Sequence, residues 1–406
     1  MRPRVPLVLV VAVSAIAPAA LHMPVPVLPL LARTFTAPTG AVQLILTLFL
    51  AGIAVGQLVY GPLSDRFGRR PVLVVGLATF LIGTAVCGVA WSLPMLIVGR
   101  IVEALGGCAG MVLGRAIVRD LFDRERSASA LATITMAMSL APSISPAIGA
   151  YLAEWTGWRA DFVLLGALGG AVAVAVGVRL EETHHDRTPA SLPAMMRSFA
   201  LLLRSQPFVG FALTTAFTSA SWFTFLASAP YLLSEVLHEP PSTYGLMILM
   251  PMAAYIVGNA AVSRFSVALG SARLLVFGLT LSLGSGMILA VWCLVGLSAW
   301  ALFVPMALSS VGNGLSQPPA LAAGLSVYPR IAGAASGLLG FLQMTIAAVG
   351  TLLIGLLPQN SAAPMIAVVV TSLALALGFG VHAVRRPNPP RPAALARLGP
   401  GAARQG

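Results

Sequence analysis

Few side chains in this sequence could carry chemistry inside its long apolar runs. His22 lies in the first run, and Arg100, Glu103 and Arg115 lie in the fourth. Arg100 and Glu103 are three residues apart, which places both on one face of a helix. An ionisable residue at membrane depth is costly, so it normally faces a polar interior and marks a path for a substrate or a proton. We therefore regard His22, Arg100 and Glu103 as candidates for proton coupling or substrate binding.

A structural role is the competing interpretation for each of these residues. An ion pair that only holds a helical bundle together would explain Arg100 and Glu103. A neutral imidazole hydrogen-bonded inside the bundle would explain His22 as well as a titrating one does. Arg115 lies nearer the end of its run, so its side chain could reach the membrane interface or line an inner cavity. We expect a structural role for Arg115.

Other chemistries find little support in the sequence. Cys87, Cys108 and Cys293 lie in apolar runs without a CxxC pair, which predicts neither a metal site nor a disulfide framework. His184 and His185 have no further ligand at metal-binding spacing, which predicts a solvated loop. The chain has no Lys, no phosphate-binding loop and no nucleophile–base set, so neither an ATP-driven pump nor an enzyme is expected. We predict no cofactor and no metal.

The composition determines the solvent around these residues. Of 406 residues, 58% are hydrophobic and 9% are charged, whereas a soluble domain usually carries about 25% charged residues. So few charges cannot cover a water-facing surface, and lipid must surround much of the chain. A spanning helix needs roughly 20 predominantly apolar residues. We predict an all-α membrane protein with twelve transmembrane helices, at 6–31, 41–62, 71–90, 93–118, 127–152, 159–179, 206–232, 243–264, 272–292, 298–324, 332–357 and 361–384.

The apolar runs divide into two sets of six. Residues 1–180 are expected to form an N-terminal six-helix half, and residues 206–384 a C-terminal half. A polar stretch at 181–205 is expected to be the cytoplasmic loop between them. Residues 385–406 are rich in Pro, Ala and Arg, which predicts a disordered cytoplasmic tail.

The positive charges indicate the orientation of the chain. All 24 basic residues are Arg, and the formal net charge is +12. They lie almost entirely in the connections at one end of the runs, which is the pattern of a cytoplasmic membrane face. The other end has only Arg33 and Arg159, together with the acidic residues Glu154, Asp161, Glu235 and Glu239. We predict a multi-pass protein of the bacterial inner membrane, with both termini cytoplasmic and no nucleic-acid partner.

The connection between the second and third runs carries the strongest local signal. It reads Gly61-Pro-Leu-Ser-Asp65-Arg66-Phe67-Gly68-Arg69-Arg70. Asp65 can accept hydrogen bonds at a helix N-terminus, where the helix dipole favours an anion, and the two glycines permit a tight turn and close helix approach. The arginines can reach acidic partners nearby, of which Asp120 and Asp123 are the obvious candidates. A positive cytoplasmic face alone explains the arginines but neither Asp65 nor the glycine spacing.

A weaker copy of this connection lies between the eighth and ninth runs, where Ser263-Arg264-Phe265 precedes Gly270 and Arg273. The first connection resembles the G-x-x-x-D-R-x-G-R-R signature of the major facilitator superfamily. The resemblance implies two parallel six-helix repeats that bind substrate near the membrane midplane and rock around it. It also implies a latch that holds the cytoplasmic side shut in the outward-open state, formed by Gly61, Asp65, Arg66, Gly68, Arg69, Arg70 and Asp120.

The fifth run contains Pro142, Pro146 and Gly149, which resemble a signature of proton-coupled antiporters in this superfamily. Proline kinks a helix, and glycine lets another backbone approach. Generic helix packing explains these residues about as well, because both types are common in spanning helices. The signature favours export over uptake.

A closer resemblance is to the Bcr/CflA group of drug exporters, and it covers most of the chain. The stretches that carry it are 22–29, 115–122, 228–231 and 333–344. This group has an acidic residue in its first helix where this chain has His22. Drug exporters commonly show R-x-x-Q-G in the fourth helix, whereas here Glu103 follows Arg100 and the glycine moves to Gly106. His22 or Glu103 could therefore carry the proton, and by position along their helices the two could face one another.

The resemblance implies proton-driven export of small amphipathic drugs or antibiotics by a monomer in the lipid bilayer. Transport of a physiological metabolite is the alternative. A non-transporting membrane sensor is a third hypothesis from another class, and it would require an appended signalling domain. Aromatic, Met and polar side chains suit a cavity for amphipathic compounds. The candidates for that cavity are Met23, Arg115, Trp222, Phe223, Tyr255, Asn259, Gln343 and Met344.

Overall fold

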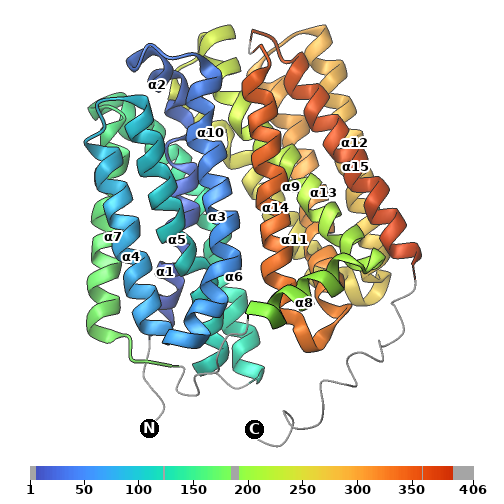
Figure 1. The fold of residues 1–406 in the computed structure, drawn as a ribbon. Coiled ribbons are helices and arrows are strands. Elements are labelled where there is room, and N and C mark those ends of the chain that lie inside the picture. The colour runs from blue at the N-terminus through green and yellow to red at the C-terminus, as the bar shows by residue number, and fades with distance from the viewer. Residues whose placement is uncertain (1–5, 122–123, 184–191, 359, 387–406) are drawn as a thin grey trace, which may run out of the picture.

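The computed structural model describes residues 6–121, 124–183, 192–358 and 360–386, and these contain helices and no strand. The first half of the bundle holds α1 (Leu7–His22), η1 (Val25–Val27), α2 (Leu28–Thr34), α3 (Thr39–Phe67), α4 (Arg69–Gly88), α5 (Leu93–Leu121), α6 (Arg124–Thr156) and α7 (Arg159–Arg179). The second half holds α9 (Gln206–Tyr231), η2 (Leu232–Val236), α10 (Pro241–Met247), α11 (Leu249–Leu269), α12 (Ser271–Val295), α13 (Ala299–Ser326), η3 (Pro329–Ile331), α14 (Ala332–Leu356) and α15 (Ala363–Arg385). The predicted all-α membrane fold is confirmed (Figure 1).

Ten helical stretches within the described residues are long and apolar enough to cross a membrane. The helices α6 and α13, with 33 and 28 residues, are also long enough to cross a membrane, but they are not among these ten. Polar side chains account for the lower hydropathy of α13, because Ser310, Asn313 and Gln317 line an internal cavity instead of facing lipid. Helices therefore lie at all twelve predicted positions within the described ranges, although not each position holds one continuous helix.

The first predicted run, 6–31, is not one continuous helix. It breaks after His22 into α1, the short η1 turn and α2. Pro24, Pro26 and Pro29 follow the break, and none of them has the backbone N–H that a continuous helix would use. The break places His22 in the last turn of α1, in the interior of the bundle.

The two halves repeat the same local geometry. Gly68 joins α3 to α4 with φ 99°, and Gly270 joins α11 to α12 with φ 83°. Both values lie in the left-handed region that favours glycine. The helix α4 packs on α5 as α12 packs on α13, and α3 packs on α5 as α11 packs on α13. The weak sequence repeat thus corresponds to two parallel six-helix repeats.

The segment between the halves contains a helix of its own, α8 (Leu192–Leu203). It packs against α9 and α14 and lies across the end of the bundle (Figure 1). We call this end the arginine-rich face, because Arg66, Arg119 and Arg330 lie at the ends of helices there. The predicted tail at 385–406 begins too early, because Arg385 still belongs to α15. The predictions for His184, His185, Asp123 and the rest of the tail, 387–406, fall outside the described residues.

The two halves meet mainly along α3 and α14, which run side by side (Figure 1). Thr47 and Thr351 share a hydrogen bond of 2.9 Å in this contact. At the face opposite the arginines, Arg33 of α2 forms an ion pair with Glu235 of η2 at 2.9 Å. The halves are therefore in contact at the middle and at the opposite face.

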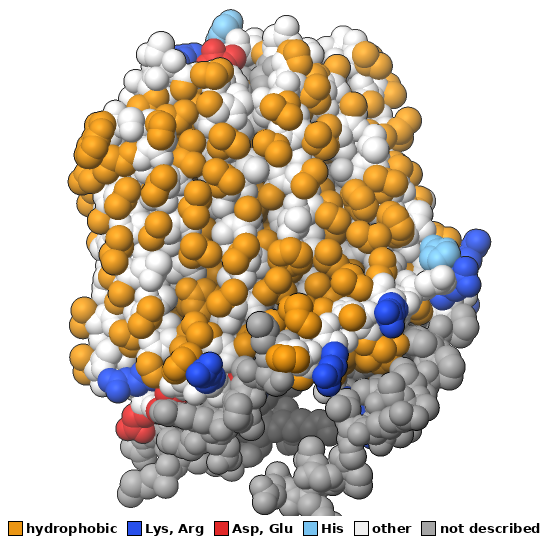
Figure 2. All heavy atoms as spheres, viewed as in Figure 1, with side chains coloured by type: hydrophobic (Ala, Val, Ile, Leu, Met, Phe, Trp, Pro, Cys, Tyr) orange, Lys and Arg blue, Asp and Glu red, His pale blue; other side chains and the backbone are white. Residues whose placement is uncertain are grey.

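On the side of the molecule seen in Figure 2, hydrophobic side chains cover the surface between the two ends, and the charged side chains gather toward those ends. Trp91, Val178 and Leu294 are each at least three-quarters exposed. Such a surface would be unfavourable in water, and it matches the solvent properties of lipid. The sides of the bundle are thus suited to face the bilayer.

Candidate functional site

An ion pair between Arg100 and Glu103 is buried inside the first half. Nη1 of Arg100 donates to Oε2 of Glu103 at 2.6 Å, and the two side chains are 1% and 0% exposed. Oε1 of Glu103 accepts a hydrogen bond of 2.9 Å from Thr84 on α4. The Arg100 guanidinium also lies 4.0 Å from the centre of the Phe49 ring. Charge pairing, hydrogen bonding and an aromatic face together offset the cost of burying these charges.

Glycines on α4 and α5 let the two helices pack closely beside this pair. A Cβ on Gly83 would lie 2.8 Å from the carbonyl oxygen of Gly99, and a Cβ on Gly99 would lie 2.6 Å from Sγ of Cys87. Real Cβ atoms do not approach so closely, so the two helices can touch here only without side chains. This contact places the backbone of α4 directly against Glu103.

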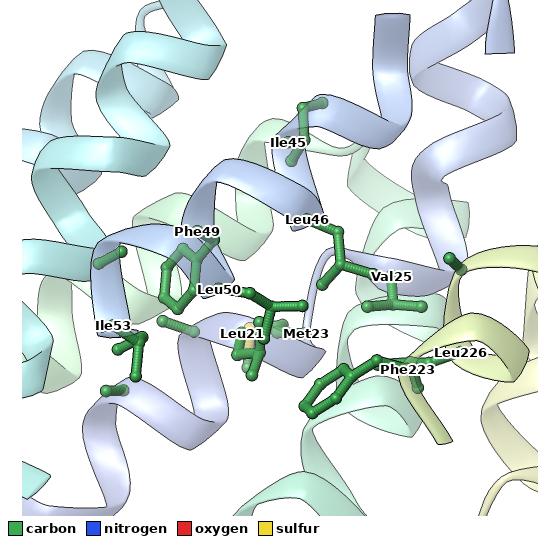
Figure 3. Packing of buried hydrophobic residues seen from close by; sticks show 14 of the residues in the cluster. Leu21, Met23, Val25, Ile45, Leu46, Phe49, Leu50, Ile53, Phe223 and Leu226 are labelled. Atoms are coloured by element: carbon green, nitrogen blue, oxygen red, sulfur yellow. The ribbon is translucent and has the colours of Figure 1, made fainter. Parts of the chain in front are cut away.

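Arg100 also connects α5 to the broken first helix. Its Nη1 donates to the carbonyl oxygen of Ala20 at 2.9 Å, two residues before His22. Figure 3 shows the apolar packing around this break, where Met23 and Val25 belong to one hydrophobic cluster with Leu50 of α3 and Phe223 of α9. A change in the position of Arg100 would therefore disturb the backbone of α1 next to the break.

His22 faces the second half of the bundle. Its Nδ1 hydrogen-bonds to the carbonyl oxygen of Pro18 at 2.9 Å, and its ring lies 6.0 Å from the ring of Phe223. Since a carbonyl only accepts hydrogen bonds, Nδ1 carries the hydrogen and Nε2 stays available. The side chain lines a cavity between the halves, whereas Glu103 bonds only to Arg100 and Thr84 within the described residues. The expected face-to-face arrangement of His22 and Glu103 is thus not found.

Asp161 is an internal acidic residue that the sequence reasoning assigned to the opposite face. It is the third residue of α7, it is fully buried, and neither carboxylate oxygen has a hydrogen-bond partner among the described residues. In the sequence, only its position two residues inside the predicted run 159–179 could have indicated that Asp161 is buried. An acidic residue at the membrane–water interface would occupy the same position.

The central cavity, of about 310 Å³, lies between the halves, and none of the described residues that line it carries a charged side chain. From the first half it is lined by His22, Met138 and Pro142, and most of its remaining wall comes from the second half. Nε2 of Gln343 donates to Oγ of Ser219 at 2.7 Å across this wall. The predicted cavity residues that do line it are Trp222, Phe223, Tyr255, Gln343 and Met344.

The other cavity candidates lie elsewhere. Met23 is buried in the apolar core at the helix break. Asn259 donates from Nδ2 to the carbonyl oxygen of Tyr255, one turn earlier on α11, and does not line the cavity. Arg115 lines a separate hollow at the arginine-rich face, which is one of the two positions expected for its side chain, and the structural role expected for it stays a prediction.

The proline and glycine residues of α6 have three different neighbours. Pro142 lines the central cavity. The carbonyl oxygen of Pro146 would lie 3.4 Å from a Cβ on Gly245, where α6 meets α10 of the second half. A Cβ on Gly149 would overlap the carbonyl oxygen of Met23. The helix therefore contacts the cavity, the other half and the α1 break in turn.

Arg69 is the centre of the network at the α3–α4 connection. Its Nε donates to Oδ2 of Asp120 at 3.0 Å, and its Nη1 donates to Oδ1 of Asp65 at 2.5 Å. Arg66 instead lies over the ring of Phe67, with 5.1 Å between its guanidinium carbon and the ring centre. Of the acidic partners suggested by the sequence, Asp120 does contact an arginine of the motif.

Two details of this motif differ from expectation. Asp65 lies near the C-terminal end of α3, so it does not occupy a helix N-terminus. Glu182 is the carboxylate at the start of α4, where it accepts hydrogen bonds from the backbone N–H groups of Arg69 and Arg70 at 2.8 and 3.3 Å. Gly68 leaves room for that carboxylate, which occupies the place of a Cβ. Gly61 lies inside α3 with open space beside it, so it makes neither a turn nor a close helix contact. The sequence could not indicate Glu182 because it lies 113 positions from Arg69.

Comparison with known proteins places this geometry in a family. The model of the Major Facilitator Superfamily matches residues 10–351. The chain belongs to the major facilitator superfamily. It resembles solved superfamily transporters in fold, including a bacterial homolog of the human lysosomal transporter Spinster (TM-score 0.70, 16% identity, 93% of this chain and 94% of that one) and a D-xylose-proton symporter (TM-score 0.71, 15% identity, 93% and 94%).

Within the superfamily, the similar sequences include several resistance proteins. The bicyclomycin resistance protein homolog of Haemophilus influenzae is 29% identical, covering 80% of this chain and 82% of the relative. Multidrug resistance protein D of Escherichia coli is 30% identical, covering 87% and 88%. The chloramphenicol resistance protein of Pseudomonas aeruginosa is 28% identical, covering 88% and 86%. These names agree with the resemblance to the Bcr/CflA group.

The superfamily fold explains why the cavity lies where it does. Members bind substrate at the interface of their repeats, and the central cavity of this chain lies at that interface. No cluster of three or more metal-ligating side chains is present in the part of the chain that the structure describes. The candidate site is thus the central cavity together with the buried Arg100–Glu103 pair beside it.

Proposed function

We propose that this protein exports small amphipathic drugs or antibiotics across the bacterial inner membrane in exchange for protons. The observation that carries the proposal is the connection between an uncharged cavity and a buried ion pair. His22 lines the cavity, and Arg100 bonds to the backbone of the same helix two residues earlier. The names of the related resistance proteins favour drugs as the cargo.

The arginine distribution supports the orientation in this proposal. Positive residues gather on the cytoplasmic side of membrane proteins, so the arginine-rich face and both chain ends are assigned to the cytoplasm. The halves 1–180 and 206–384 would then move as two bodies, joined by the 181–205 segment, in a monomer. The Arg33–Glu235 pair would open on the outer side while the cytoplasmic side closes.

The α3–α4 connection would act as the cytoplasmic latch. Asp65 lines the hollow at this face, and Gly333 and Ala334 in the first turn of α14 line the same hollow. A helix N-terminus attracts an anion, so rocking of the halves could bring the carboxylate against α14. Arg69 and Asp120 would hold Asp65 in position for that contact.

Proton exchange would act through the helix break. Protonation of Glu103 would remove the negative charge that faces Arg100 at 2.6 Å. The guanidinium would then lose its main partner, and its bond to the carbonyl oxygen of Ala20 would have to readjust. Because Ala20 and His22 share the last turn of α1, the proton would alter the cavity wall.

Two experiments test this function. The chain is expressed in an efflux-deficient bacterium and challenged with a panel of antibiotics, and resistance should rise and then vanish in Asp65→Asn and Arg100→Ala at equal expression. Drug-dependent proton flux is measured in vesicles for His22→Ala and Glu103→Gln, with loss of flux expected in at least one. Wild-type flux in both variants would reject the coupling residues, and no resistance to any compound would favour a physiological metabolite as the substrate.

A further inference from the structure

The hollow at the arginine-rich face, which we call the vestibule, contains two basic residues that the proposed coupling mechanism does not use. It has a volume of about 500 Å³ and is lined by Arg115 and Arg119 of α5. Arg119 lies in the last turn of its helix, where a positive cytoplasmic face explains it. Arg115 lies one turn deeper, and membrane topology alone does not explain it.

The side chain of Arg115 folds back on its own helix instead of extending away from it. Its Nε donates to the carbonyl oxygen of Met111 at 3.2 Å, and Met111 lies one turn further from the arginine-rich face. An arginine that only needed solvation would extend toward the interface instead. The other guanidinium N–H groups of Arg115 have no hydrogen-bond partner in the described part of the chain, and they line the vestibule.

The vestibule has little negative charge to balance these arginines. Among the described residues, Asp65 is the only acidic one that lines it, and Asp65 is already paired with Arg69. The opposite wall, from α14, contributes Gly333, Ala334, Ser336 and Gly337. The central cavity beyond has no charged residue among the described residues that line it. A cation on this path would meet uncompensated positive charge, while an anion would meet free N–H donors.

We propose that Arg115, assisted by Arg119, binds a carboxylate or similar anionic group of the substrate, so that the transporter selects acidic and neutral amphipathic compounds over lipophilic cations. This inference rests on the proposed export function and specifies its substrate class. The guanidinium fork of Arg115 supplies paired donors for a planar anion. Arg119 raises the local concentration of anions at the mouth of the vestibule.

Equilibrium binding to the purified full-length chain tests the proposal. Two probes share a xanthene scaffold: fluorescein, which is anionic at neutral pH, and a rhodamine methyl ester, which is cationic. Fluorescein should bind about tenfold more tightly than the rhodamine ester, and Arg115→Gln should remove about that factor. Arg115→Lys should retain only part of the preference, because the charge stays but the paired donors of the guanidinium are lost. Arg264→Gln, at an exposed arginine outside the vestibule, serves as the matched control.

Several results would overturn the proposal. These are equal binding of the two xanthenes, no binding of fluorescein, or an unchanged preference in a folded Arg115→Gln variant that elutes as a monodisperse peak. Stronger binding of a short-chain phosphatidylglycerol, with displacement of fluorescein, would assign the site to a lipid headgroup and reject the substrate assignment. The assay uses no proton gradient, so a charge preference without cellular resistance would reject the export function alone.

Discussion

Separating the two charges of the Arg100–Glu103 pair should be far more harmful than removing both. Glu103→Gln keeps the size of the side chain and an acceptor for Thr84, but it leaves the buried guanidinium without a counter-charge. Removing one member of a buried pair typically costs about 3–5 kcal/mol, while replacing both is often close to neutral. We therefore expect Arg100→Met and Glu103→Gln each to destabilise by about that amount, and the double variant to be more stable than either.

Part of the loss in Arg100→Met will remain in the double variant. The guanidinium also stacks on Phe49 at 4.0 Å and bonds to the carbonyl oxygen of Ala20. A desolvated cation–π contact contributes about 2 kcal/mol, and a hydrogen bond that involves a charged group about 1.5–3 kcal/mol. The coupling energy of the cycle, rather than the stability of the double variant, is therefore the decisive quantity, and we expect it to exceed about 2 kcal/mol.

The assay is reversible unfolding in mixed micelles, followed by Trp fluorescence for the wild type, both single variants and the double variant. The matched control is Arg33→Gln and Glu235→Gln, because that pair is exposed, with 66% and 45% of its side chains accessible. An exposed pair should give a coupling energy below about 1 kcal/mol. A buried pair whose coupling energy does not exceed that of the exposed pair would refute the reasoning.

The same double variant separates the structural interpretation of the pair from the functional one. If Arg100 and Glu103 only hold the bundle together, restored stability should restore drug-dependent proton flux. If Glu103 exchanges the proton, the double variant should be stable and inactive in flux. Active transport in the stable double variant would thus remove these residues from the coupling mechanism.

Three further predictions follow from the packing of the halves. Gly149→Ala should lower the free energy of unfolding by about 1–3 kcal/mol and weaken resistance, because the added Cβ has no room at the α1 break. The control Gly170→Ala has open space beside it and should leave the free energy of unfolding unchanged in the same assay. Asp161→Asn should preserve or raise the thermal midpoint, because a buried carboxylate without partners costs about 1–3 kcal/mol; a large loss of stability would show that the carboxylate has a partner. A bismaleimide cross-link between cysteines placed at Arg33 and Glu235 should abolish transport while leaving binding intact, and undiminished transport would contradict opening of the halves at that face.

Much of the fold could be predicted because lipid imposes simple demands on a sequence. A helix that satisfies its own backbone hydrogen bonds is one of few ways to cross a bilayer, so the apolar runs predict the helices directly. The turn at Gly68 was predictable for a similar reason, since the motif spacing requires a residue that tolerates a positive φ. The clustering of arginine likewise predicted which ends of the helices lie together.

The candidate site was only partly predictable. Arg100, Glu103 and His22 stood out because ionisable residues are rare in apolar runs, but Asp161 did not, because it lies near the end of its run. Trp222 and Gln343 were predicted from residue type and do line the cavity, whereas Asn259, of equally suitable type, faces its own helix backbone. Residue type indicates what a side chain can do, and the rotation of its helix decides what it faces.

The sequence by itself determined the solvent, the number and positions of the helices, and the residues able to carry a charge inside them. These properties depend on composition and short-range spacing. Only the tertiary structure decided that Arg100 reaches the carbonyl oxygen of Ala20, that Glu182 rather than Asp65 meets the start of α4, and that His22 and Glu103 face different surroundings. Those contacts join residues that are distant in the chain, and they depend on which helices become neighbours and how closely their glycines let them approach.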